Sequence, residues 1–326
     1  MTRHPGQDRP RSGEQIALSA HGYRAEIASV GATLRGLTHD GRALVAGFAA
    51  DVVRPVYRGA VLVPWPNRVG GGRYAFDGTE HQLALTEPDR GNALHGLVAW
   101  ADFAVAESTD ELVTLRHRLV PQQGYPFDLL VEVTYALSPE GLHWTVRTTN
   151  LGAAAAPYGT GPHPYLVAGA GTVDDWLLTV PAGQVLEVDA ESLLPLRRTA
   201  VEDVESGRYD FRSGRVIGPS SIDHALTDLA GDTDLAGDTD LAGDDDVVVT
   251  VLAADGQGVG MRWDAGVLPW VQVHTADRPE PELHRSGLAV EPMTCPPDAF
   301  TTGDDLVVLG SGDAHEASWT IFAVTD

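Results

Sequence analysis

The chain alternates apolar and polar residues with a period of two over much of its 326 residues, and this alternation limits its fold more than any other feature. In LLVEVTYALSPEGLHWTVRTTN, residues 129–150, apolar side chains occupy every second position on both sides of the turn SPEG. Successive side chains of a strand point to opposite faces, so this segment is expected to form a hairpin with one buried face. No long window shows an apolar stripe with a period of 3.6 residues. The pattern therefore predicts an all-β protein.

Other segments repeat this pattern. In GRYAFDGTEHQLAL, residues 72–85, the pair Asp77-Gly78 stands between two short alternating runs, which is the strongest short-range signal for a hairpin. Further strands are expected at residues 111–119, 245–254 and 316–324. With 36 glycines and 21 prolines between the strands, the chain is expected to form a large antiparallel β-sandwich.

One tandem repeat interrupts the alternation. DLAGDT begins at Asp228 and again at Asp234, and DLAGDD follows at Asp240. Because the repeat has neither the spacing of an EF-hand loop nor the glycine pattern of a calcium-binding roll, we expect a flexible acidic insertion at residues 228–246. The polar residues 1–15 are expected to be a disordered N-terminal segment, and residues 16–326 a single domain.

Composition excludes several classes of protein. The formal net charge of -24 argues against nucleic acid or an anionic membrane as a partner, because both require a basic surface. The one cysteine, Cys295, excludes an internal disulfide framework and a cysteine-rich zinc site. The N-terminal residues contain no apolar signal core, and no stretch approaches the roughly 20 apolar residues that span a bilayer. We therefore expect a cytoplasmic protein without a metal, and the sequence leaves its oligomeric state open.

Three segments place polar residues between prolines and glycines. Asn67 and Arg68 follow Pro-Trp-Pro and precede three glycines, His95 stands in GNALHG, and His163 lies between two prolines in YGTGPHPYL. Prolines on both sides restrict the backbone of His163, so its ring could be held in one direction. Each segment taken alone also fits a structural role, with the histidines satisfied by backbone groups and Arg68 in a surface ion pair.

Near the C-terminus, GLAVEPMTCPPDAF, residues 287–300, sets Glu291 between an apolar run and a cluster of prolines. Glutamate is seldom fully buried unless it is paired, and Pro292 holds Glu291 in an extended backbone. Such a rigid position suits a carboxylate that acts as an acid or a base. Asp223, in SSIDHAL, would on its own count as a surface acid.

Taken together and in this order, these segments resemble the aldose 1-epimerase (mutarotase) family. The matching pieces are PNRVGGGRYAFDG, NALHG, GPHPYL, the Asp223 segment and LAVEPMTCPPDAF, and the resemblance runs from Gly31 to the terminal WTIF strand. It implies a large β-sandwich with an open sugar cleft and no cofactor, which interconverts the α and β anomers of an aldose.

The resemblance also implies roles for particular residues. His163 matches the general acid and Glu291 the general base, while His95, Arg68 and Asp223 match residues that hold the sugar. Opening a cyclic hemiacetal needs a base for the C1 hydroxyl proton and an acid for the ring oxygen, so one Glu and one His suffice. We expect nearby carboxylates, including Glu291, to raise the proton affinity of His163 while partial burial opposes them.

Aromatic side chains are expected to line the cleft, because pyranose C–H faces pack on rings. The candidates are Trp65, Trp100 and Tyr165, with ordinary core packing as the alternative for each, and Asn67 is expected to bind substrate beside Arg68.

Three other functions remain open. The segment Pro162–Leu166 leaves the identity of the sugar undecided, so the substrate could be phosphorylated or sulfonated. Such a sugar would need extra basic groups, for which the candidates are Arg54, Arg58, Arg73, Arg278 and Arg285.

A glycoside hydrolase could use Asp223 and Glu291 as its carboxylate pair. A carbohydrate-binding protein of the same fold would hold a sugar without turnover.

Overall fold

The structure is a computed structural model that describes residues 9–231 and 246–325. Within these residues no helix is long and apolar enough to cross a membrane. The elements are β1 (Gln15–Ala20), β2 (Tyr23–Ala28), β3 (Thr33–His39), β4 (Arg42–Ala43), β5 (Val61–Leu62), β6 (Arg68–Gly70), β7 (Arg73–Phe76), β8 (Thr79–Gln82), β9 (Asn92–Leu94), β10 (Ala104–Ser108), β11 (Leu112–Leu119), β12 (Leu129–Ser138), β13 (Gly141–Asn150), β14 (Ala156–Tyr158), β15 (Gly161–Pro162), β16 (Tyr165–Leu166), β17 (Leu177–Thr179), β18 (Ala182–Val188), β19 (Pro195–Ala200), β20 (Arg215–Val216), β21 (Asp223–Leu229), β22 (Asp246–Leu252), β23 (Gly258–Asp264), β24 (Trp270–His274), β25 (Leu288–Met293), β26 (Val307–Leu309) and β27 (Ala314–Val324), with a 3₁₀ turn at Val173–Asp175 and the one-turn helix α1 (Ala299–Thr302).

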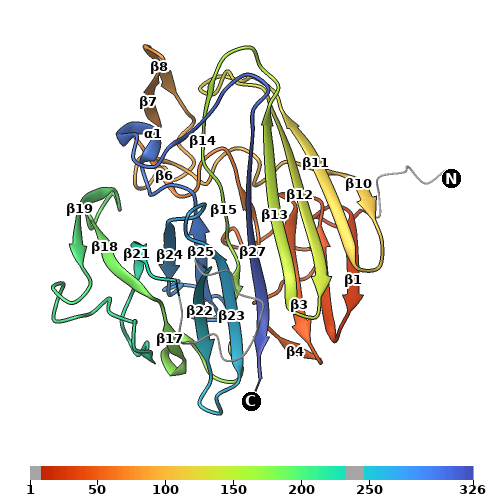
Figure 1. The fold of residues 1–326 in the computed structure, drawn as a ribbon, viewed down its shortest axis with the longest axis vertical. Coiled ribbons are helices and arrows are strands. Elements are labelled where there is room, and N and C mark those ends of the chain that lie inside the picture. Colours follow the sequence, from red (N-terminus) through yellow and green to blue (C-terminus); the bar gives the residue numbers. More distant parts are fainter. Residues whose placement is uncertain (1–8, 232–245, 326) are drawn as a thin grey trace.

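Three sheets form the body of the molecule. The largest has the order β10-β11-β12-β13-β27-β23-β22-β17-β20, the second β16-β25-β24-β21-β18-β19, and the third β1-β2-β3-β4. Figure 1 shows the long strands β11, β12, β13 and β27 side by side in the largest sheet. One apolar core takes side chains from all three sheets. The prediction of an all-β, antiparallel sandwich is confirmed.

The two predicted hairpins are present. In β12 and β13 the inward positions are fully buried, among them Val131, Tyr135 and Trp144, and Tyr135 lies directly opposite Trp144. In the β7–β8 hairpin, Asp77 and Gly78 have φ values of 47° and 74°. Positive φ at both central residues is the requirement of a type I′ turn, which explains the Asp-Gly pair.

The two faces of the six-stranded sheet carry different side chains, and the polar side chains lie on the face away from the apolar core. Along β24, Val271 and Val273 join the apolar core, whereas Gln272 and His274 point to the opposite face. In β25, Val290 belongs to the core and Glu291 to the opposite face. One face of this part of the sheet therefore packs on the core, and the other carries these polar side chains beside a small apolar cluster that includes Trp270 and Met293.

Two expected boundaries need correction. Residues 9–14 belong to the ordered structure: Ser12 is buried, and its hydroxyl donates a hydrogen bond to the Ala50 carbonyl at 2.8 Å. Strand β1 then begins at Gln15, so order starts before the expected residue 16, while residues 1–8 lie outside the described part. The expected insertion also starts too early, because Asp228 and Leu229 end β21; its residues 232–245 lie outside the described part.

Candidate active site

Three neighbouring strands bring four polar side chains to one face of the six-stranded sheet. Asp223 of β21 lies opposite His274 of β24, and Gln272 of β24 lies opposite Glu291 of β25. Directly opposed residues of antiparallel strands point to the same face, and so do residues two apart on one strand. The strand register therefore gathers these four residues, although they are far apart in the sequence.

His163 is held between two aromatic rings in the short segment that joins β15 to β16. Its ring stacks on Tyr165 with centroids 5.1 Å apart and lies parallel to Tyr57 at 6.3 Å. Its backbone N–H donates to the Ala60 carbonyl at 3.0 Å, and its carbonyl accepts from the Gly59 N–H at 2.8 Å. The ring is thus fixed by packing on both faces and by backbone hydrogen bonds on both sides.

His163 and Glu291 face one another. The distance from His163 Nε2 to Glu291 Oε1 is 3.4 Å, and the two residues are only 5% and 1% exposed. His163 Nδ1 and Glu291 Oε2 are buried without a hydrogen-bond partner in the described part of the chain. Both residues also line a cavity, described below, so these atoms are placed to form hydrogen bonds with a ligand.

Burial controls the protonation of this pair. Burial, aided by the negative charge of Asp223, raises the pKa of Glu291 well above 4.5, although Arg68 acts in the opposite direction. Burial, aided by the positive charge of His274, lowers the pKa of His163 to about 3. Both expected effects on the pKa of His163 are present, and burial is the larger in the free protein, because desolvation of the imidazolium outweighs the attraction of Asp223.

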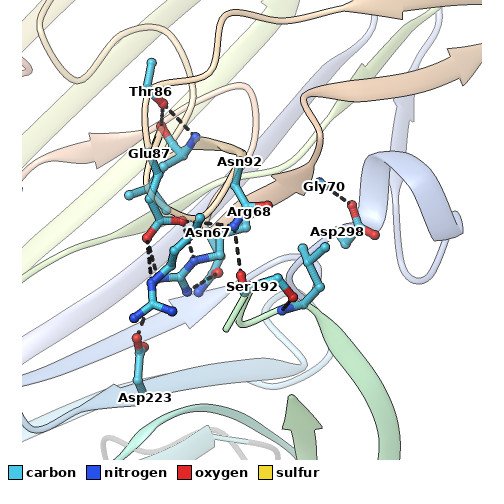
Figure 2. Close-up of polar contacts among 12 residues, drawn as sticks. Asn67, Arg68, Gly70, Thr86, Glu87, Asn92, Ser192, Asp223 and Asp298 are labelled. Atoms are coloured by element: carbon cyan, nitrogen blue, oxygen red, sulfur yellow. Dashed lines mark hydrogen bonds and ion pairs between the residues drawn. The ribbon is translucent and has the colours of Figure 1, made fainter. Parts of the chain in front are cut away.

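Arg68 is anchored at the wall of the site by a carboxylate that the sequence analysis did not single out. Its Nε and one terminal nitrogen donate to the two carboxylate oxygens of Glu87 at 2.9 and 3.0 Å. Asn92 also donates to Glu87, at 3.0 Å, and Arg68 lies 3.6 Å from Asp223 (Figure 2). Such a two-point contact fixes the plane of the guanidinium. Arg68 is therefore oriented toward Asp223 before any ligand binds.

Asn67 and His95 are placed by unusual backbone conformations. Their φ values are 53° and 59°, and the His95 N–H donates to the Asn67 carbonyl at 2.8 Å. Left-handed backbone at residues other than glycine is strained and clusters at functional sites. The His95 ring contacts Tyr57 at 4.7 Å and His163 at 4.9 Å. Burial lowers the pKa of His95 well below 6.5, so its ring is neutral near neutral pH.

These side chains line one cavity of about 340 Å³. Six of the expected site residues line it, namely Asn67, Arg68, His95, His163, Asp223 and Glu291. The cavity is also lined by residues that were not predicted as site residues, among them Tyr57, Glu87, Gln272 and His274. Arg278, a candidate only for a charged substrate, lines it as well. Among the described residues, no group of three or more His, Cys, Asp or Glu side chains is arranged to hold a metal ion.

Some of the missed residues had a signal in the sequence and others had none. Gln272 and His274 alternate with valines in β24, so two polar residues on an apolar strand could have marked a second buried face. Glu87 precedes a proline, as Glu291 does, but Glu280 does so as well and does not line the cavity. Only the tertiary structure separates these glutamates.

The aromatic expectations need correction. Trp65 is 2% exposed and packs on Phe300 in the apolar core, so it does not line the cavity. Tyr165 is 1% exposed and stacks on His163 without lining the cavity itself. Trp100 is 53% exposed and contacts Tyr57 outside the set of lining residues. The aromatic ring that does line the cavity is that of Tyr57.

The fold and the site together define a large β-sandwich of the galactose mutarotase-like class, with a cavity that holds a buried histidine and glutamate in contact. A solved structure described as the GalM/aldose epimerase homologue of C. elegans matches with a TM-score of 0.80 and 20% identity, covering 96% of this chain and 99% of that one. A putative aldose 1-epimerase of Escherichia coli matches with a TM-score of 0.78 and 19% identity, covering 95% and 99%. At these identities the likeness concerns the fold.

Sequence comparison assigns the family. The family model for aldose 1-epimerase matches residues 14–321. The uncharacterized protein YihR of Escherichia coli is 36% identical over 312 residues, which covers 95% of this chain and 94% of YihR. The galactose mutarotase of Rattus norvegicus is 30% identical over 225 residues, which covers 63% of this chain and 62% of that protein. The chain belongs to the aldose 1-epimerase family.

Proposed function

We propose that this protein is an aldose 1-epimerase that interconverts the anomers of a free hexose by acid and base catalysis, with Glu291 as the base and His163 as the acid. Glu291 takes the proton of the C1 hydroxyl while His163 gives a proton to the ring oxygen. The C1–O5 electron pair stays with the ring oxygen, and the C1–O1 bond becomes a carbonyl. Rotation about C1–C2 and the reverse steps close the ring as the other anomer.

The observation that carries this proposal is the contact of His163 Nε2 with Glu291 Oε1 at 3.4 Å, inside a cavity lined by further hydrogen-bonding groups. An acid and a base must both be within reach of the same reacting group. The neutral pair favoured by burial and the ion pair that reacts contain the same number of protons. They differ only by the transfer of one proton across this contact, so the raised pKa of Glu291 and the lowered pKa of His163 are compatible with the reaction.

The wild-type protein is expected to accelerate the change in optical rotation of freshly dissolved α-D-glucose or α-D-galactose. Polarimetry measures this directly, with the uncatalysed rate in the same buffer as the reference. If the protein binds the sugar, as measured by calorimetry, but leaves the rate unchanged, it is a carbohydrate-binding protein and the proposal is wrong.

The pH dependence of kcat/KM provides a second test. A second proton binds to the His163–Glu291 pair only at low pH, because the pKa of His163 is about 3 in the free protein. We therefore expect activity to persist well below pH 6.5, the usual pKa of a free imidazole, and the acid limb to lie below pH 5. An acid limb near pH 6.5 would contradict the burial of the catalytic imidazole. H117N, which replaces a histidine outside the cavity, should show the same acid limb as the wild type.

One observation favours a second candidate substrate, a hexose with an anionic substituent. Of the five arginines considered for such a substrate, Arg278 lines the cavity and the other four do not. Its Nε is buried without a hydrogen-bond partner, and its side chain makes no ion pair among residues 9–231 and 246–325. Arg285, by contrast, pairs with Asp174 and Asp277. A guanidinium without a carboxylate partner in a ligand cavity suits a phosphate or sulfonate group.

Replacing Arg278 with glutamine separates the two substrates. If the sugar is anionic, R278Q should reduce kcat/KM for a hexose 6-phosphate or 6-sulfonate by about tenfold or more, because a charge-assisted contact is lost. The same variant should change kcat/KM for the neutral hexose much less. Exchange spectroscopy of the two anomers measures both rates, and R73Q on the exposed β7–β8 hairpin is the matched control. Equal losses for both sugars would rule out a specific role in binding the anion.

A further inference from the structure

Glu87 carries a largely buried charge at the wall of the cavity, and the proton transfers proposed above do not use it. Its side chain is 17% exposed and lies in the segment that joins β8 to β9. Its two oxygens accept from Nε and a terminal nitrogen of Arg68 at 2.9 and 3.0 Å and from Asn92 at 3.0 Å. Arg90 Nε lies 3.6 Å away. A carboxylate with three such partners is suited to hold them in place rather than to exchange protons with a ligand.

Arg68 transmits this anchoring toward the reacting pair. The guanidinium is a rigid planar fork, so its two contacts with Glu87 fix where its other N–H groups point. One terminal nitrogen donates to the Asn67 side-chain oxygen at 3.2 Å, and the other lies 3.6 Å from the Asp223 carboxylate (Figure 2). Burial raises the pKa of Glu291 most, Asp223 adds to that rise, and Arg68 opposes it. The ionisation of Glu291 therefore depends on where Arg68 is held.

Glu87 also compensates the charge of Arg68. An unbalanced guanidinium near Glu291 would favour the ionised carboxylate, because an opposite charge lowers the pKa of an acid. The other titratable or charged side chains around Glu291 are those of Tyr57, Arg90, His95, His163, Tyr165, His274, Asp277 and Arg278. Of these, Arg90 pairs with Glu87, but its side chain is 36% exposed and its charge is screened by water. The main route from Glu87 to Glu291 is therefore Arg68.

The same carboxylate joins Arg68 to the rim of the cavity. Asn92 is 1% exposed, and its amide nitrogen donates to Glu87 at 3.0 Å and to the Ser192 carbonyl at 2.8 Å (Figure 2). A primary amide has two N–H donors, so Asn92 uses both in this link. The next residue of the rim, Leu193, lines the cavity with a φ of 55°, a conformation that persists only where the surroundings determine it.

We infer that Glu87 is a positioning residue for the His163–Glu291 pair: it fixes the Arg68 guanidinium toward Asp223 and compensates its positive charge. The inference rests on the proposed function, because it gives Glu87 a part in the proton transfers of that pair without contact to the reacting atoms. A purely structural role in the segment before β9 would make Glu87 matter for stability alone. The two roles predict different results for the ionisation of Glu291.

The variant E87Q keeps the size of the side chain and removes its charge, so the unbalanced Arg68 should favour ionised Glu291. The one proton that the His163–Glu291 pair shares is then lost at lower pH, and the base limb of the kcat/KM profile should move down by about half a pH unit or more. We expect kcat at the optimum to fall about tenfold, because a glutamine has one acceptor oxygen where glutamate has two. E80Q, a charge-matched change at an exposed residue of β8 outside the cavity, should alter neither. Lower stability with an unmoved base limb would overturn the inference.

A direct titration needs no substrate. The ¹³C signal of the Glu291 carboxyl carbon, assigned by its absence in E291Q, reports the ionisation of this group in the free protein. It should titrate at lower pH in E87Q than in the wild type or E80Q, and an unchanged titration would overturn the inference. If the wild type anomerises no sugar, the proposed function is wrong, and this titration alone then decides whether Glu87 controls the ionisation of Glu291.

A double variant keeps the inference testable if E87Q does not fold, since a buried guanidinium that has lost its carboxylate is destabilising. R68Q/E87Q replaces both charges with amides and is compared with R68Q, in which Glu87 keeps Asn92 and Arg90 as partners. If Glu87 acts through Arg68, kcat/KM of R68Q/E87Q should equal that of R68Q within about twofold. A further loss of about tenfold would show that Glu87 acts independently of Arg68, and the inference would be wrong.

Discussion

Replacing Glu291 with glutamine is expected to lower kcat for anomer interconversion by roughly 10²–10⁴-fold, the usual contribution of a positioned acid or base. Glutamine keeps the size and shape of the side chain but cannot take the C1 hydroxyl proton. The loss should appear in kcat more than in sugar affinity, because the neighbouring Arg68 and Asp223 remain in place. Polarimetry or anomer exchange spectroscopy measures the rate, and calorimetry measures the affinity.

The fold of E291Q should be unaffected, and its stability gives an independent check. The folded-state pKa of Glu291 is raised, so the wild-type protein loses stability as the pH rises above 4.5 toward that folded value. E291Q lacks the ionisable group and should therefore be at least as stable as the wild type at neutral pH. E107Q, a charge-matched change on the exposed part of β10, is the control. A variant that unfolds or that keeps wild-type turnover would contradict the role of Glu291 as a buried base.

Replacing His163 with asparagine is expected to reduce kcat by a similar factor, roughly 10²–10⁴-fold, since no other group would protonate the ring oxygen as efficiently. The stacked position of the ring between Tyr57 and Tyr165 means that the change removes packing as well as acid function. Thermal unfolding of H163N must therefore be measured alongside its kinetics. H117N, at a half-buried histidine of β11 outside the cavity, should retain full activity.

A rescue experiment separates loss of the acid from loss of packing. H163A leaves space between the two tyrosine rings, and added imidazole should restore part of the activity if the missing function is proton transfer. The restored rate should follow the imidazole concentration and saturate. Restored thermal stability without restored turnover would show that His163 acts only in packing.

The positions of several strands and of two hairpins were predictable because they depend on local sequence. Alternation in residues 129–150 predicts β12 and β13 and the side chains that each buries, since the two faces of a strand are fixed by the backbone. Likewise Asp77 and Gly78 tolerate the positive φ that a two-residue hairpin needs. The order of strands within the large sheet, where β27 pairs with both β13 and β23, depends on contacts between distant segments.

The structure brings expected site residues to one cavity where the backbone itself is constrained. The cavity is lined by His163, which lies between prolines, and by Glu291, which precedes Pro292. It is also lined by Asn67 and Arg68, which precede three glycines. The prediction failed for Trp65, because a tryptophan near a site residue can pack equally well into the core or the cleft. The sequence also left open whether burial or the carboxylates dominate the pKa of His163, because the burial of a charge depends on everything packed around it.

The sequence by itself determined that the chain forms antiparallel strands, where two of its hairpins turn, and which family it resembles, because each of these depends on neighbouring residues or short motifs. The tertiary structure decided which of many carboxylates meet in one cavity. Strand pairing places Glu291 beside Gln272 and Asp223 beside His274, and folding brings Glu87 to Arg68. These contacts join residues from distant parts of the chain, and the loss of water around them sets the pKa values of the site.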